Sequence, residues 1–125
     1  MLQEPNPTKQ LTLYGANVGN IHERTTDIFE IVCGAATADA ELAVLQRNLT
    51  KSRLEDVRMV ARSLAEKNAL KIGTTVEQAT DILWALGSAD IYRMLVADRG
   101  WSPPQYQQWL GRTLLDSLLI HSGAE

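Results

Sequence analysis

The sequence predicts an all-α fold, built as a single helical bundle domain of five to six helices. Apolar residues recur three and four positions apart along most of the chain, which is the spacing of one helix face. All four prolines lie at Pro5, Pro7, Pro103 and Pro104, so the stretch 8–102 contains none. The chain has no Asn-Gly or Asp-Gly hairpin signal. Its 125 residues are enough for one domain with a sizeable core.

The first helical stretch covers about residues 8–37 of the predicted domain, which spans 8–120. We expect residues 1–7 to be a disordered or linker N-terminus and residues 121–125 to be a frayed tail. The length of the first stretch fits one long helix, or two helices joined by a kink near residues 24–27, and the pattern leaves both open. The apolar stripe on one face consists of Leu11, Tyr14, Val18, Ile21, Thr25, Ile28 and Val32.

The second helix is predicted over about residues 40–67. Asp39 is a residue type that caps helix N-termini, and Asn68 is suited to end the helix. A turn follows at residues 71–75. The apolar stripe of this helix consists of Leu42, Leu45, Leu49, Val57, Val60 and Leu64.

Cap residues also place the next two helices. Thr75 and Gln78 form a capping-box pattern that opens a third helix, which continues to about Leu86 before Gly87 breaks it. Ser88 can cap a short fourth helix over about residues 89–98.

The last helix follows Gly100, which ends the fourth one. Ser102 or Pro103 is the expected N-cap, because proline fits the first helical turn, where its missing N–H has no helical partner. Since Pro103 precedes another proline, which disfavours a helical conformation at Pro103, the helix can also start at Pro104.

Two helices are apolar around more of their circumference than one core requires. The last helix is apolar over nearly twice the roughly 100° stripe of an ordinary surface helix, and the third is similarly broad. A central position in the bundle would explain this; so would a partner, because large exposed apolar patches are uncommon on monomers. We expect a two-fold homodimer. The expected interface residues are Ile82, Leu86, Tyr92, Tyr106, Trp109, Leu110, Thr113, Leu114 and Leu118.

Polar residues that interrupt the apolar faces predict a ligand cavity between the first two long helices. Arg53 is the sharpest case, because a buried guanidinium needs an anionic or carbonyl partner. An internal salt bridge, or a guanidinium that snorkels past the leucines, would also explain it. Gly15 leaves room beside Tyr14 and His22. The candidate ligand-binding residues are Tyr14, His22, Phe29, Gln46, Thr50, Arg53 and Trp84, of which His22 and Trp84 also suit a core position.

Composition excludes several function classes. The net charge of −3 and the scattered basic residues argue against a nucleic-acid grip by this chain. The sequence has no apolar run long enough to span a bilayer and no signal-peptide core, so a cytoplasmic protein without membrane partners is expected. A single cysteine, Cys33, rules out an internal disulfide and a cysteine zinc cluster.

The sequence shows no catalytic constellation, and we expect neither an enzyme, nor a metal site, nor a cofactor. His22 and Cys33 lie eleven residues apart, which is about 16 Å along a continuous helix and too far for a nucleophile–base pair. No Gly-rich phosphate loop follows a predicted strand. The carboxylates lie on polar helix faces, as solvated side chains do.

The run TTVEQATDILWALGSADIYRMLVADRGWSPPQYQQWLGRTLL, residues 74–115, strongly resembles the C-terminal domain of tetracycline-repressor-type (TetR family) transcriptional regulators. Upstream, LTLYGANVGNIHERTTDIFEIV, AATADAEL and RSLAEKNALKIG fit the same domain in the same order. The resemblance covers nearly the whole chain from about Pro7.

The resemblance implies a domain that binds a small, partly apolar effector and forms a four-helix dimer interface. It places that interface at residues 75–98 and 103–119. In the family a three-helix DNA-binding domain precedes the effector-binding domain. Here Met1 stands only a few residues before the start of the effector-binding domain. We therefore expect a fragment, a trimmed form or a natural half-protein that reaches DNA only through a missing N-terminal domain. The alternative is a stand-alone dimerising module that pairs with full-length relatives and needs no ligand.

Overall fold

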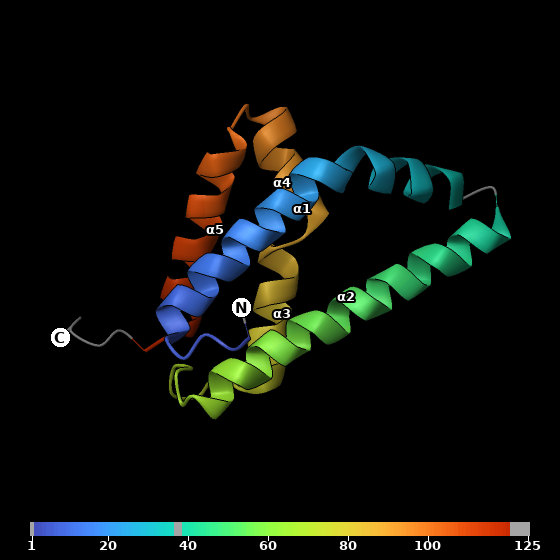
Figure 1. Cartoon of the computed structure of the whole chain (residues 1–125). Coiled ribbons are helices and arrows are strands. Elements are labelled where there is room, and N and C mark those ends of the chain that lie inside the picture. The colour runs from blue at the N-terminus through green and yellow to red at the C-terminus, as the bar shows by residue number, and fades with distance from the viewer. Residues whose placement is uncertain (1, 37–38, 121–125) are drawn as a thin grey trace.

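The computed structural model of the chain describes residues 2–36 and 39–120, without the side chains of residues 25–36. Within these ranges the fold is all-α, as predicted (Figure 1). The described residues form no β-strand; a single isolated antiparallel bridge joins Leu70 to Leu119. Among the described helices, none combines the length and the apolar character needed to cross a membrane.

Helix α1 spans Pro7–Ala36 without interruption, so the first stretch is one helix and not two. It begins at a proline, which fits there because its missing N–H would have no helical partner. The Asn6 side chain accepts a hydrogen bond from the backbone N–H of Lys9 at 3.2 Å and so caps the first turn. In Figure 1 the second half of α1 runs in a different direction from the first.

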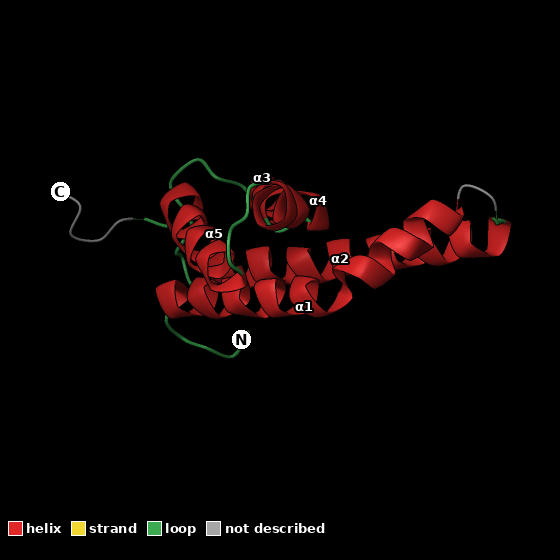
Figure 2. Ribbon diagram, turned by 90° about the horizontal axis from the view of Figure 1, so that it is seen from above, coloured by secondary structure: helices red, strands yellow, loops and turns green. Residues whose placement is uncertain are grey.

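Helix α2 spans Ala40–Glu66 and starts at the predicted cap. The Asp39 carboxylate accepts hydrogen bonds from the backbone N–H groups of Glu41 and Leu42, at 2.8 and 3.2 Å. Asn68 has a positive φ of 55°, the left-handed conformation that often follows a helix end. Helices α1 and α2 lie side by side and extend together beyond the other helices (Figure 2).

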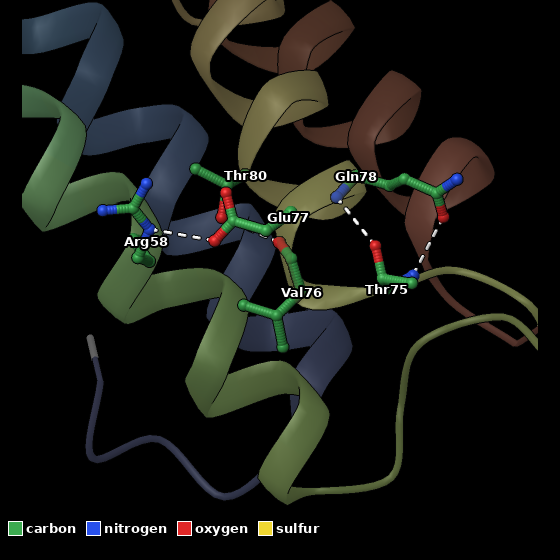
Figure 3. Close-up of polar contacts among 6 residues, drawn as sticks. All are labelled: Arg58, Thr75, Val76, Glu77, Gln78 and Thr80. Atoms are coloured by element: carbon green, nitrogen blue, oxygen red, sulfur yellow. Dashed lines mark hydrogen bonds and ion pairs between the residues drawn. The ribbon is translucent and has the colours of Figure 1, made fainter.

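Helix α3 spans Val76–Leu86 and opens with the predicted capping box. Thr75 and Gln78 exchange side chain–backbone hydrogen bonds at 2.9 and 3.1 Å (Figure 3). In the same turn Glu77 pairs with Arg58 of α2 at 3.1 Å (Figure 3). The capping box fixes where α3 starts, and the exposed ion pair joins the first turn of α3 to α2 at the surface.

The predicted fourth helix is divided. Ser88 caps α4, Ala89–Arg93, and a π-helical turn, η1, Met94–Asp98, continues it to Gly100 at φ 76°. Helix α5 then spans Pro103–Leu118, with Ser102 as its cap: the Ser102 hydroxyl accepts from the backbone N–H of Gln105 at 3.2 Å. The start at Pro103 shows that the following proline does not displace it.

Five residues predicted at a dimer interface lie instead in the chain's own core. Buried residues cannot form a surface for a second copy, so the expectation drawn from the apolar circumference of the helices is wrong for these five. The cause is the central position of α5, which packs on α1, on α3 and on the π-helical turn. The five residues are Tyr92, Tyr106, Leu110, Leu114 and Leu118. The other four, Ile82, Leu86, Trp109 and Thr113, remain partly exposed.

The crossing of α1 and α5 is close enough for backbone contact. A Cβ atom built on Gly15 would lie 3.1 Å from the backbone N of Gly111 and 3.3 Å from the carbonyl oxygen of Gln107. The expectation that Gly15 leaves room for a ligand beside Tyr14 and His22 is therefore wrong, because the α5 backbone fills that space.

Candidate functional site

A groove of about 560 Å³ runs between α1 and α2. This volume falls in the range of small-molecule sites, which are mainly apolar with a few placed polar groups. Leu2, from the segment expected to be a linker, also contributes to the wall. The lining residues are Leu2, Tyr14, Val18, Ile21, His22, Leu49, Ser52, Arg53, Asp56, Val57, Met59 and Val60.

The groove lies where the sequence predicted a cavity and contains three of the predicted residues, Tyr14, His22 and Arg53. Trp84 does not line it but lies beneath Arg53. Gln46 and Thr50 are not part of the lining, and Thr50 is exposed. The side chain of the seventh candidate, Phe29, lies outside the described residues.

Arg53 projects from α2 onto α3. Its Cζ lies 4.2 Å from the ring centroid of Trp84, a cation–π contact, and its Nη2 donates to the Trp84 carbonyl oxygen at 3.1 Å. Burial lowers the pKa of Arg53, while Tyr14 and Tyr106 oppose that shift. The carbonyl partner expected for a buried guanidinium is thus present. Arg53 forms no ion pair with any residue that the structure describes.

His22 is buried on α1, and its Nε2 lies 2.7 Å from the carbonyl oxygen of Gly87. A carbonyl only accepts, so Nε2 carries the proton and donates. Burial lowers the pKa of His22; the hydrogen bond to Gly87 opposes this and the charge of Arg53 adds to it. His22 is therefore neutral near pH 7.

Three aromatic side chains pack behind the groove. Tyr92 and Tyr106 meet edge to face at 4.9 Å between centroids, and the His22 ring lies 5.4 Å from Tyr92. Burial raises the pKa of Tyr106 above its ordinary range, and Tyr14 adds to the shift. Burial also raises the pKa of Tyr92, so the phenols of Tyr92 and Tyr106 both stay protonated and add no charge behind the groove.

The last turn of α3 receives side chains from three other helices. Arg53 of α2 donates to the Trp84 carbonyl, His22 of α1 to Gly87, and the Tyr106 hydroxyl of α5 to Leu86 at 3.4 Å. The last carbonyls of a helix have no helical partner, and a cation is favourable there because of the helix dipole. We call these three donors the α3 clamp.

Sequence reasoning missed the α3 clamp. It found Arg53 and His22 as polar residues on apolar faces but assigned Gly87 only the role of a helix breaker. A Cβ on Gly87 would lie 3.0 Å from the Leu83 carbonyl oxygen and 3.3 Å from the Tyr14 hydroxyl oxygen. The glycine thus permits the close approach of Tyr14 and of the clamp residues. A glycine at position 87 was the one sign in the sequence that side chains meet there.

A second polar cluster, partly buried, joins α1 to the end of α2, away from the groove, and was also missed. The amide of Gln10 donates to the Ser63 hydroxyl at 3.1 Å, and the Lys67 ammonium donates to both side chains. Each group has a partner and none lines the groove. The cluster therefore holds the two helices in register.

Among the side chains that the structure describes, those of residues 2–24 and 39–120, no group of three or more His, Cys, Asp or Glu is placed to hold a metal ion. The polar groups of the groove are hydrogen-bond donors and one carboxylate, which suit binding. No family model matches the sequence, and the searches of curated proteins and of solved structures found no match either.

Proposed function

We propose that this chain is the effector-binding and dimerisation domain of a TetR-like transcriptional regulator, and that the groove between α1 and α2 binds a small, partly apolar molecule. The observation that carries the proposal is the groove itself, with Tyr14, His22 and Arg53 on an otherwise mainly apolar wall. The resemblance of residues 74–115 to that family supports it independently. DNA would be contacted by a domain outside these 125 residues.

The dimer part of the proposal now depends on four partly exposed residues of α3 and α5. An interface through Ile82, Leu86, Trp109 and Thr113 is smaller than the one the helix pattern suggested, since the inner faces are occupied. The alternative of a pairing module without a ligand has less support, because such a module has no need of the groove between α1 and α2.

A thermal-shift screen tests the proposal. Ligands that bind only the folded state stabilise it, by about 2.7 kcal/mol when the ligand concentration is a hundred times Kd. This stabilisation raises the melting temperature. We expect apolar or amphiphilic molecules of the size of the groove to give such shifts, whereas small polar metabolites give none.

A matched pair of variants assigns the shifts to the groove. Ile21 lines it and is 48% exposed, so Ile21→Trp should fill the groove without disturbing the core and should abolish the shifts. Leu13 is on the same helix, 38% exposed and outside the lining, so Leu13→Trp should keep them. A broad panel without any shift, or shifts that survive in Ile21→Trp, would count against a working site.

A further inference from the structure

The polar groups on the groove wall differ in the hydrogen bonds that they can offer a ligand. Arg53 can only donate there, because it is a cation, and Tyr14 keeps a hydroxyl proton to donate, because burial raises its pKa. His22 already uses its Nε2 proton on Gly87. The groove therefore presents hydrogen-bond donors next to apolar surface.

Arg53 has unused hydrogen-bonding capacity. A guanidinium carries five N–H donors, and among the described residues Arg53 donates only to the Trp84 carbonyl. The Tyr14 hydroxyl also has unused hydrogen-bonding capacity, because it forms no hydrogen bond with a described residue. Since no fully buried polar side-chain atom in the described part lacks a partner, that hydroxyl is not fully buried, and Tyr14 is part of the groove lining.

We propose that the groove selects an amphiphilic carboxylate, whose anionic head accepts hydrogen bonds from Arg53 and Tyr14 and whose apolar body lies along Val18, Ile21 and Met59. This inference rests on the proposed function and specifies its ligand. Arg53 is a partly buried cation that pairs with no carboxylate among the described side chains, which is the complement that a single anionic head requires.

The other residues of the groove restrict which anionic head group fits. One guanidinium and one hydroxyl match the two oxygens of a singly charged carboxylate. Asp56, an exposed residue of the lining, would repel a head group of higher charge such as a phosphate monoester. The apolar residues of the wall exclude small polar acids, which would leave that surface in contact with water.

The test compares three ten-carbon probes with different head groups. We expect calorimetry at pH 7.5 to show that decanoate binds at least about tenfold more tightly than decanol, and that decylammonium binds least. Arg53→Gln, which keeps a donor for Trp84, should lower decanoate affinity about tenfold and leave decanol affinity unchanged. Arg47→Gln, at an exposed arginine of the same helix outside the lining, is the matched control.

The comparison of probes on the unaltered chain keeps the inference testable even if Arg53→Gln fails to fold. Equal affinity for decanoate and decanol, or a preference for decylammonium, overturns it. An equal loss of decanoate binding in Arg47→Gln and Arg53→Gln also overturns it. If other molecules in the screen bind and Ile21→Trp abolishes their binding, the proposed effector-binding function stands without the carboxylate inference. If no molecule binds, both the proposed function and the carboxylate inference fail.

Discussion

Arg53, His22 and Tyr14 could be placed at the site from the sequence because helix periodicity gives the angle of each side chain around its axis. The same method does not show which part of a helix face meets a neighbouring helix. Gln46 shares the face of Arg53 but lies about 10 Å away from it along α2, and it does not reach the groove. Partners from other helices, such as the Gly87 carbonyl for His22, are equally invisible in a single helix pattern.

The pH dependence of stability should report the buried state of His22. Its pKa in the folded chain lies below the ordinary 6.5, so below pH 6.5 the unfolded chain binds a proton that the folded chain does not. The free energy of unfolding should therefore fall as pH drops from about 7 toward the lowered pKa, by at most about 1.4 kcal/mol per pH unit. Urea unfolding between pH 5 and 7.5 measures this.

The control for that prediction is His22→Gln, which keeps a donor near Gly87 but does not titrate. Its unfolding free energy should lack the His22 contribution to the pH slope. If the variant and the original chain lose stability in parallel between pH 7 and pH 5, His22 is not the group responsible.

Among the helices, the starts could be predicted and the contacts could not. Asp39, Thr75, Ser88 and Ser102 each cap the helix that the sequence assigned to it, because capping is local chemistry between residues two or three positions apart. The π-helical turn and the crossing of α1 with α5 depend on packing between distant segments. The breadth of apolar surface on α5 was read correctly, yet its cause is contact with three of the chain's own elements.

The α1–α5 crossing gives a matched pair of glycine substitutions. Gly15→Ala should destabilise the chain by about 1–3 kcal/mol, because its Cβ would press on α5 backbone atoms that cannot rotate away. Gly111→Ala should be neutral or stabilising by about 0.5–1 kcal/mol, since its Cβ would lie 3.8 Å from Thr12 and alanine favours a helix. Chemical denaturation of both variants measures the difference; equal effects would show that the crossing is looser.

For the whole molecule, the all-α class followed from the repeat of apolar residues, and association of copies remains a prediction. At tens of micromolar, sedimentation should show a dimer. Ile82→Glu on the outer face of α3 should shift it to single copies, because two-fold symmetry would bring two buried carboxylates into one interface. Val44→Glu on α2, at a site 46% exposed, should not. Single copies of the unaltered chain would remove the dimer from the proposal.

The α3 clamp also determines how the chain changes direction. Only Gly87 and Ser88 stand between α3 and α4, and Gly87 is held by a side chain from α1 while Trp84 and Leu86 are held from α2 and α5. The direction in which α4 leaves this corner therefore depends on three helices at once. A molecule bound to the Arg53 guanidinium would therefore act on the last turn of α3, directly before this corner, without touching α4.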